Sequence, residues 1–400
     1  MVARLFQSVV FCLVLAVVTL GCGESFSSAV DGPPASLDLG PGADGPRVDA
    51  PAPRDGSPPK RDAPAPRVDG PTRRDTTTPR ADSAPPRVDA APRADLGPVT
   101  PSCDPYSVRS PAPEVLIGPV GLETKLLQRI QLAQKQILVM IYQFTRYNFS
   151  NALIAAHKRG VQVKVLLDGK QGANSSVRSK LTAAGIAVKS APTSFTHAHA
   201  KVIWIDGYEA IVMSANLITY SMGGERNYGV IDRDPYDLKQ LKQLFDRDWA
   251  GTGTVDLSCS RLVVSPINAR ARMLAHVNRA KKTLDFAVMY LDDKTIKTAV
   301  LAQAKAGVAV RVLLANPAWI TSNTARAAEL KAAGVPVKYF KNYDLHAKLM
   351  ISDGIPFVGS QNFSYTSIQK NREIGVFVNA STRSQIVAQF AADWKLGVAP

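Results

Sequence analysis

Hydrophobic and polar positions follow two periodicities along this chain, and both begin only after about residue 105. From there, segments with apolar residues three or four positions apart alternate with short runs of consecutive apolar residues. The first pattern is typical of amphipathic helices, and the second of strands that are buried on both faces. The sequence therefore predicts an α/β fold whose sheets are largely covered by helices.

In the first half of this region, helices and strands are predicted to alternate. The predicted helices are 124–135, 151–159 and 175–184, and the predicted strands are 136–142, 161–167, 186–189, the segment from 199 and 210–213. Gly160 and Gly185 follow the second and third helices, where glycine takes the left-handed conformation that ends a helix.

The second half repeats this order, which indicates an internal duplication. Its predicted helices are 269–282, 294–306 and 323–333, and its predicted strands are 284–290, 308–314, 335–340 and the segment from 346. The stretches 158–167 and 305–314 read KRGVQVKVLL and KAGVAVRVLL. We therefore predict repeat 1 over 106–254 and repeat 2 over 255–400, with glycines near 251–253 marking the loop between them.

The first 22 residues have the features of a targeting segment. Arg4 precedes an apolar run over 9–20 that is too short to span a membrane comfortably. The run ends in Thr-Leu-Gly-Cys at 19–22, which resembles the lipobox of bacterial lipoproteins, with Thr19 in place of the usual apolar residue. We expect a signal peptide over 1–22, lipidation of Cys22, and export to the periplasm, outer membrane or cell surface. Ordinary signal cleavage nearby is the alternative.

Residues 23–105 are predicted to be a disordered linker. Pro-Arg-Val-Asp recurs at 46–49, 66–69 and 86–89, proline is abundant, and apolar residues are too few to bury a core. Either a tether that holds the folded part away from a membrane anchor or a passive spacer fits this composition.

The net charge and the cysteines indicate which partners and which compartment to expect. The chain has a net charge of +15, and residues 23–99 hold 10 Lys/Arg against 12 Asp/Glu, so the excess positive charge lies on the two repeats. Such a charge favours polyanions or anionic membranes as partners. Cys12 lies in the signal peptide, which leaves Cys103 and Cys259, one near the start of each repeat; export makes a disulfide between them possible, and the sequence leaves it open.

One motif occurs twice, 147 residues apart. Its pattern is H-x-K-x4-D followed by S-x-N. The first copy consists of His199, Lys201, Asp206, Ser214 and Asn216, and the second of His346, Lys348, Asp353, Ser360 and Asn362. Alternate residues of a strand point to the same face, so the His and Lys of each copy lie on the same face of their strand. Two imidazoles and two ammonium groups converging on one oxyanion suggest a phosphate diester as substrate.

With this duplicated motif, the chain resembles the phospholipase D superfamily over about 106–395. The resemblance implies two tandem α/β/α repeats packed about a pseudo-twofold axis, with one active site and no metal or cofactor. It also implies attack by one imidazole on phosphorus to form a phosphohistidine, while the other protonates the leaving oxygen. His199 is the expected nucleophile and His346 the expected acid.

The resemblance also assigns the supporting residues. The two lysines neutralise the phosphate, while Asn216, Asn362, Ser214 and Ser360 donate hydrogen bonds to its oxygens. Asp353 is expected to orient His199, and Asp206 to orient His346, across the pseudo-twofold axis. The alternative is that both aspartates merely end strands before the turns at Gly207 and Gly354.

The repeats differ at one supporting position. Glu373 in the stretch 371–376 stands where the family often has a glutamate that supports the site, and the matching residue of repeat 1 is Asn227. The two half-sites are therefore predicted to be chemically unequal, which fits unequal roles of the histidines. Glu225 has no assigned role, and Met213 replaces the glycine found at Gly359. Of the other histidines, His197 is expected at the rim, His157 in solvent and His276 in a structural position.

The predicted function is metal-independent hydrolysis of phospholipid phosphodiesters by a monomer at a membrane surface. An exported endonuclease is the alternative, because the positive charge suits nucleic acid and bases can stack on aromatic side chains near the site. These aromatic residues are Tyr142, Phe144, Tyr147, Tyr290 and Tyr365. A pseudoenzyme that only binds anionic lipid is a third alternative. Trp319 and Ile320 are expected either to enter a lipid interface or to cap the core.

Overall fold

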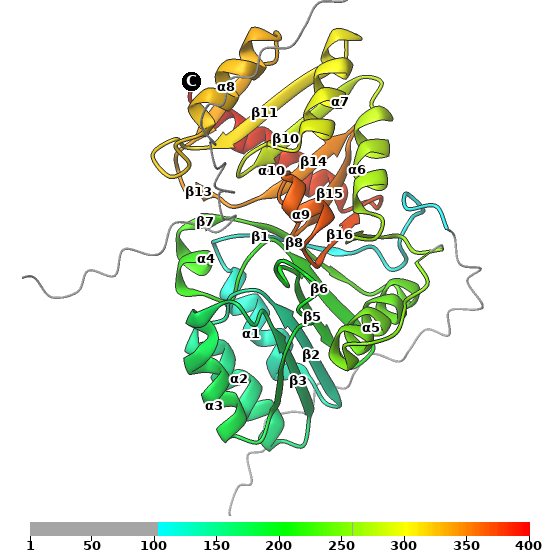
Figure 1. Ribbon diagram of the computed structural model, residues 1–400, viewed down its shortest axis with the longest axis vertical. Coiled ribbons are helices and arrows are strands. Elements are labelled where there is room, and N and C mark those ends of the chain that lie inside the picture. Colours follow the sequence, from blue (N-terminus) through cyan, green and yellow to red (C-terminus); the bar gives the residue numbers. More distant parts are fainter. Residues whose placement is uncertain (1–102, 258) are drawn as a thin grey trace, which may run out of the picture. The chain divides into compact units, whose positions relative to one another are not determined.

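The computed structural model describes residues 103–257 and 259–400. The predicted signal peptide, the lipidation of Cys22 and residues 23–102 of the predicted linker lie outside the described residues. The described part consists of two α/β repeats, each built on a mixed seven-stranded sheet (Figure 1). The predicted fold class is therefore confirmed.

Repeat 1 carries a sheet with the strand order β1-β8-β6-β5-β2-β3-β4. Its strands are β1 Glu114–Ile117, β2 Gln136–Ile141, β3 Gln162–Leu167, β4 Ala187–Ser190, β5 Lys201–Ile205, β6 Glu209–Met213 and β8 Tyr228–Asp232, with a short β7 Glu225–Arg226 outside the sheet. Its helices are α1 Leu122–Leu132, α2 Tyr147–Lys158, α3 Ser175–Ala183, α4 Thr219–Gly223, α5 Pro235–Ala250 and the 3-10 helix Gly172–Asn174. Strands β2, β3 and β4 are parallel, and the remaining pairs are antiparallel.

Repeat 2 has the same connections, with the equivalent order β9-β16-β15-β14-β10-β11-β12. Its strands are β9 Leu262–Ser265, β10 Thr283–Val288, β11 Ala309–Ala315, β12 Val337–Phe340, β14 Lys348–Ser352, β15 Ile355–Gly359 and β16 Glu373–Phe377, with a short β13 Asp344–Leu345. Its helices are α6 Ala269–Asn278, α7 Lys294–Lys305, α8 Asn323–Ala332, α9 Tyr365–Gln369 and α10 Arg383–Leu396. The matching orders show the duplication inferred from the sequence.

The helices and strands predicted from periodicity are present, with ends displaced by a few residues. The sequence analysis did not assign the long helices α5 and α10. For α5 a start signal was available, because Asp234 precedes Pro235 and its carboxylate accepts the N–H of Tyr236. Most residues of α5 are polar, so the apolar residues that it buries give only a weak helical pattern in the sequence.

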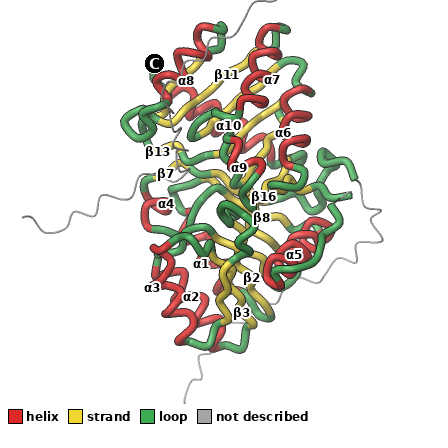
Figure 2. Tube along the Cα trace, viewed as in Figure 1, coloured by secondary structure: helices red, strands yellow, loops and turns green. Residues whose placement is uncertain are grey.

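Except for β4, which is mostly exposed, the strands of both sheets are largely buried, which explains the continuous apolar runs. Figure 2 shows the helices that flank the sheets. In β2, Val139 and Ile141 pack with the outer helices α1, α2 and α3, whereas Leu138 and Met140 point to the opposite face. That second face belongs to a core that contains residues of both repeats, together with α5 and α10. The repeats therefore share their interior.

Polar contacts also join the repeats where the motifs lie. Strands β7 and β13 form a two-stranded parallel sheet, and Ala198 is bridged to Arg372. Arg372 of repeat 2 pairs with Asp248 of α5 at 2.7 Å. Reciprocally, Arg226 of repeat 1 pairs with Asp393 of α10 at 3.1 Å. Residues next to both motif histidines are thus fixed by the opposite repeat.

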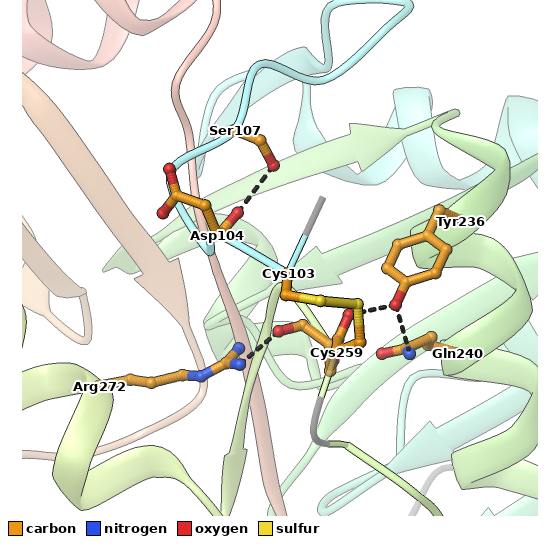
Figure 3. The surroundings of a disulfide bond; sticks show 8 residues. Cys103, Asp104, Ser107, Tyr236, Gln240, Cys259 and Arg272 are labelled. Atoms are coloured by element: carbon orange, nitrogen blue, oxygen red, sulfur yellow. Dashed lines mark hydrogen bonds between the residues drawn. A yellow bond between two sulfur atoms is a disulfide. The ribbon is translucent and has the colours of Figure 1, made fainter. Parts of the chain in front are cut away.

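A disulfide links the beginnings of the two repeats (Figure 3). It joins Cys103, before β1, to Cys259, before β9, and closes a sequence separation of 156 residues. Tyr236 of α5 donates a hydrogen bond to the carbonyl oxygen of Cys259. A crosslink over so long a loop restricts the unfolded chain strongly. The pairing that the sequence left open is a bond in the structure.

Candidate active site

The two motifs enter equivalent central strands, β5 and β14. His199 and Lys201 come from repeat 1, His346 and Lys348 from repeat 2, and all four side chains are buried. Each lysine ammonium donates a hydrogen bond of 2.7 Å to the carbonyl oxygen of the histidine two residues before it. The same backbone geometry thus presents one imidazole and one ammonium group from each repeat.

A glutamate from repeat 2 holds the histidine of repeat 1. Nδ1 of His199 lies 2.9 and 2.8 Å from the two carboxylate oxygens of Glu373. Ser367 donates to the same carboxylate at 2.6 Å, and the Asn371 side-chain amide at 3.2 Å. Glu373 therefore orients His199 across the repeat interface and keeps the Nδ1 hydrogen in place.

The histidine of repeat 2 is held in a related but different way. Nδ1 of His346 lies 3.3 Å from a carboxylate oxygen of Glu225 and 3.2 Å from Oδ1 of Asn227. Glu225 in turn accepts hydrogen bonds from Ser221 at 2.6 Å and from the Asn227 amide at 3.1 Å. Repeat 1 reads Glu-Arg-Asn at 225–227 and repeat 2 reads Asn-Arg-Glu at 371–373, so the same two side chains stand in exchanged positions.

The assignment of Asp353 to His199 and of Asp206 to His346 is wrong. The Asp206 carboxylate accepts the backbone N–H groups of 134–136 at 2.7–2.8 Å. Asp353 accepts those of 281–283 at 2.8–2.9 Å. Both residues have positive φ angles, 56° and 46°, which turn the carboxylates toward the loops before β2 and β10 and away from the imidazoles. Burial opposes ionisation of Asp353, but these N–H donors outweigh it and lower its pKa.

The predicted phosphate-binding serines and asparagines divide into two groups. Ser214 donates to Asn227 at 2.8 Å, and Ser360 contacts the Ile374 carbonyl oxygen at 3.4 Å, so both hydroxyls engage neighbouring strands. Within the described part of the chain, Oδ1 of Asn216 and of Asn362 is buried without a hydrogen-bond partner. These unpartnered oxygens are acceptors and do not themselves offer a hydrogen bond to a phosphate, whereas the serine hydroxyls support the scaffold.

The buried lysines make the site a strong receptor for an anion. Burial lowers the pKa of Lys201 to about 7, although Glu373 and Glu225 act in the opposite direction. Burial and then repulsion by Lys201 hold the pKa of Lys348 well below its ordinary value. An anionic phosphate between them would relieve both penalties. The charge of the bound ligand thus completes the site.

Burial disfavours the charged form of both histidines. Burial lowers the pKa of His199 to about 4, partly offset by Glu373. Burial, with repulsion by Lys348, Lys201 and His199, holds the pKa of His346 well below its usual range. Burial and attraction also act in opposite directions on Glu373, where the contacts with His199 prevail and lower its pKa. For Glu225 burial prevails and raises the pKa. The two His–Glu pairs therefore differ in charge balance.

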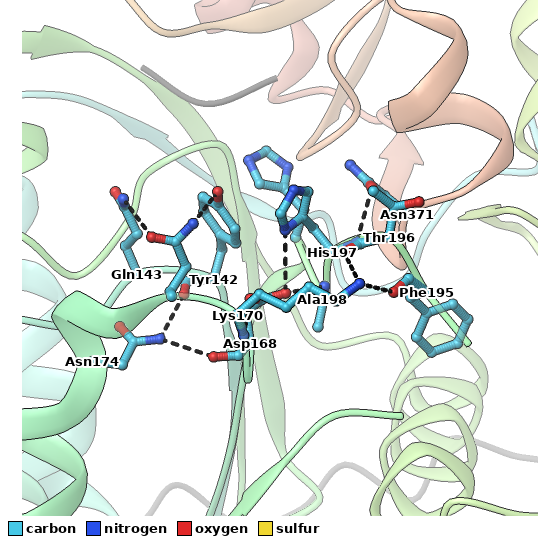
Figure 4. A network of polar contacts seen from close by, with 12 residues as sticks. Tyr142, Gln143, Asp168, Lys170, Asn174, Phe195, Thr196, His197, Ala198 and Asn371 are labelled. Carbon is cyan, nitrogen blue, oxygen red and sulfur yellow. Dashed lines mark hydrogen bonds and ion pairs between the residues drawn. The ribbon is translucent and has the colours of Figure 1, made fainter. Parts of the chain in front are cut away.

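A polar network fixes the segment that leads to His199 (Figure 4). Asp168, at the end of β3, accepts the N–H of Ala198 at 2.6 Å. Lys170 donates to the carbonyl oxygens of Phe195 and Thr196 at 3.1 and 2.8 Å. The His197 ring lies 3.7 Å from Asp168 and is partly exposed, in line with a position at the rim. Asp168 was not among the predicted site residues.

The remaining histidines lie away from the motifs. His276 is fully buried, with Nε2 3.1 Å from the Ile355 carbonyl oxygen, which is a structural position as predicted. His157, on α2, is partly exposed, with Nδ1 3.4 Å from the Val161 carbonyl oxygen.

Two further properties concern residues 103–257 and 259–400 alone. No group of three or more His, Cys, Asp or Glu side chains there is arranged to hold a metal ion. No helix there combines the length and the apolar character needed to cross a bilayer.

The fold and the site are those of the phospholipase D superfamily, with duplicated repeats that each contribute one motif histidine. The family model described as "Cardiolipin synthase, PLD-like domain" matches residues 126–249 and 273–394. The chain therefore belongs to this family, and the two matches correspond to the two repeats.

Individual relatives are distant. A mitochondrial cardiolipin hydrolase from Danio rerio is 27% identical over 143 residues, which cover 35% of this chain and 63% of that protein. A cardiolipin synthase from Oceanobacillus iheyensis is 23% identical over 314 residues, covering 67% of this chain and 65% of that protein. The chain thus spans less than two thirds of the length of either curated relative.

Among solved structures, the phosphatidylserine synthase of Haemophilus influenzae Rd KW20 superposes with a TM-score of 0.58 and 11% identity. The superposition covers 73% of this chain and 87% of that one. At this identity the likeness concerns the fold.

Proposed function

We propose that this protein hydrolyses phospholipid phosphodiesters through a phosphohistidine intermediate, without a metal ion. The observation that carries the proposal is the reciprocal pairing of His199 with Glu373 and of His346 with Glu225, beside two buried lysines. Such a site offers one nucleophile, one proton donor and two cations to a single phosphate group.

In the first step, Nε2 of His199 attacks phosphorus. Its Nδ1–H is donated to Glu373, so the Nε2 lone pair is free, and the neighbouring carboxylate stabilises the positive imidazole that forms. Lys201, Lys348 and the amides of Asn216 and Asn362 bind the phosphoryl oxygens. The phosphorus–nitrogen bond forms while the bond to the leaving oxygen breaks.

His346 supplies the proton that the leaving oxygen needs. Burial acts against the charged forms of both partners, raising the pKa of Glu225 and lowering that of His346. An anionic phosphate beside His346 favours the protonated imidazole. After the leaving alcohol departs, the now neutral His346 takes a proton from water, which attacks phosphorus and releases His199.

Support for a phospholipid substrate comes from three directions. Both curated relatives described above are named for cardiolipin chemistry. The predicted lipid anchor at Cys22 would keep the site close to a membrane. The net charge of +15 favours an anionic surface. The same charge also suits nucleic acid, and an exported endonuclease is therefore the second candidate.

Export and lipid anchoring are part of the proposal. A disulfide between Cys103 and Cys259 fits an oxidising compartment. Expression of the full chain with Cys22→Ser should move the protein from the membrane fraction to the soluble fraction without changing turnover per molecule. Equal partitioning of the two forms would contradict lipidation of Cys22.

Turnover of defined substrates tests the function. The full chain, in EDTA, is offered phosphatidylcholine and cardiolipin vesicles in one reaction and single- and double-stranded DNA in another, with His199→Ala as control. We expect release of phosphatidic acid that the variant lacks. DNA cleavage without lipid turnover would establish the endonuclease instead. Lipid turnover that EDTA abolishes would contradict the metal-free mechanism, and vesicle binding without any turnover would indicate the binding-only protein.

A further inference from the structure

Two loops occupy equivalent positions beside the site, and the same anchor holds each. In repeat 1 the Asn174 amide donates to the carbonyl oxygens of Tyr142 and Asp168 at 2.9 and 3.3 Å. In repeat 2 the Asn323 amide donates to those of Met289 and Ala315 at 2.9 and 2.8 Å. Each loop therefore starts and ends at matching points of its sheet.

Between these anchors the loops differ in length and chemistry. The repeat 1 loop has five residues, 169–173, with the sequence GKQGA, and the repeat 2 loop has seven, 316–322, with the sequence NPAWITS. Lys170 and Gln171 thus stand where the other loop carries Trp319 and Ile320. Two neighbouring positions show the same difference, polar in repeat 1 and aromatic in repeat 2. At the motif offset of 147 residues, Gln143 matches Tyr290 and Thr196 matches Tyr343.

The aromatic loop lies next to His346. The Trp319 and His346 ring centroids are 6.3 Å apart, with an edge-on orientation. Trp319, Ile320 and Tyr343 are only partly buried and pack against the shared core, which fixes their exposed surfaces. On the other side, Gln171 donates a hydrogen bond to the Tyr142 hydroxyl. The ring centroids of Tyr142 and His199 are 4.5 Å apart, with an edge-on orientation. An aromatic ring therefore borders each histidine, backed by the polar residue Gln171 at His199 and belonging to the apolar loop at His346.

We propose that Trp319, with Ile320 next to it in the loop, forms a subsite for the alcohol that leaves and enters beside His346, and that this subsite selects alcohols with apolar surface. The inference rests on the proposed function, in which His346 protonates the leaving oxygen. An in-line displacement puts the leaving group opposite the nucleophile, and hence on the side of His346 and Trp319.

The chemistry of the second step makes this side decisive. An alcohol that occupies the subsite gives its hydroxyl proton to neutral His346, and its oxygen bonds to phosphorus as the bond to His199 breaks. Water can take the same place, but apolar walls lose nothing by excluding it and gain contact with carbon. The subsite therefore biases the phosphohistidine toward transfer to amphiphilic alcohols, of which a glycerolipid is the membrane example.

Competition between two alcohols tests the subsite. The full chain turns over bis(p-nitrophenyl) phosphate in equal concentrations of 1-butanol and glycerol, and the ratio of butyl to glyceryl ester is measured. We expect a ratio above one that Trp319→Ala lowers about fivefold, the factor that roughly 1 kcal/mol of lost apolar contact gives. Ile320→Ser should lower it less. The ratio does not depend on the amount of active enzyme.

Gln171→Ala is the matched control in the polar loop and should leave the ratio unchanged. A ratio that moves with Gln171→Ala and not with Trp319→Ala would overturn the proposal and put the leaving group beside His199. Exclusive hydrolysis in the wild type would also overturn it.

A binding measurement tests the subsite even if no diester is turned over. Calorimetry with dibutyl phosphate and dimethyl phosphate should show a preference for the dibutyl ester that Trp319→Ala removes. Equal affinities of the wild type for both esters would overturn the subsite. Absent turnover of any diester, with the dibutyl preference intact, would refute the proposed function and not the subsite.

Discussion

The two repeats keep the same scaffold but hold their histidines differently. His199 contacts both oxygens of one carboxylate within 2.9 Å, whereas His346 shares its Nδ1 contacts between Glu225 and Asn227 at 3.3 and 3.2 Å. The exchange of Glu and Asn between positions 225–227 and 371–373 produces this difference. The two repeats thus share the motif histidines and lysines but differ in the partners of the histidines, which fits the proposed roles of one nucleophile and one acid.

The largest expected effect separates the roles of the histidines. Both His199→Ala and His346→Ala should reduce phospholipid turnover by about 10⁴-fold or more. With bis(p-nitrophenyl) phosphate, whose leaving group needs no proton, His346→Ala should still release one nitrophenol per enzyme and accumulate a phosphohistidine. Mass spectrometry of the quenched enzyme detects it. A phosphoenzyme in His199→Ala instead would reverse the assignment.

The glutamates come next. Glu373→Gln should lower kcat by about 10²- to 10³-fold, because His199 loses its only carboxylate partner in the described part of the chain. Glu225→Gln should cost only about tenfold, since Asn227 still accepts the Nδ1–H of His346. Steady-state kinetics on the same diester compares the two variants. Equal losses would show that the structural difference between the half-sites has no kinetic meaning.

The aspartates should behave alike in both repeats. Asn retains the left-handed backbone at 206 and 353, so Asp206→Asn and Asp353→Asn remove mainly charge-assisted hydrogen bonds to backbone N–H groups. Each should lower the free energy of unfolding by roughly 1–2 kcal/mol. Urea unfolding measures this loss, and kcat should change less than about tenfold. A far larger fall in kcat at unchanged stability would restore the orienting role.

The smallest effect concerns acid stability. His276 in repeat 2 stands where repeat 1 has Arg129, which pairs with Glu114 at 3.1 Å. Burial, then Arg279, lowers the pKa of His276 to about 3, against a contribution from Asp353 that raises it. Between these pH values His276 is protonated in the unfolded chain but not in the folded one. The free energy of unfolding therefore falls as pH falls from about 6.5 toward 3.

His276→Gln removes this one group from the balance. Its free energy of unfolding should fall less steeply between pH 7 and 5, by at most roughly 1.4 kcal/mol per pH unit. Urea unfolding of both forms at each pH gives the two slopes. Identical slopes would mean that folding does not change the pKa of His276.

The sequence predicted the fold and the identity of the motif residues because both depend on local pattern. Apolar runs such as 136–141 are buried on both faces, and the 147-residue offset aligns His199 with His346. Partners across the repeat interface were harder. The carboxylate of Asp353 was assigned by motif membership, but its turn directs it to backbone N–H groups, and only three-dimensional packing brings Glu225 to His346. The exchanged Glu-Arg-Asn and Asn-Arg-Glu stretches were the available signal.

The disulfide also determines how mechanical load would enter the protein. A pull on the chain at Cys103 reaches the fold along two covalent routes, one toward β1 and one through Cys259 toward β9. Both strands lie at the edge of a seven-stranded sheet, where hydrogen bonds can be peeled away in succession. Sharing the force between two edges lowers the tension on each. The crosslink thus distributes such a load over both repeats.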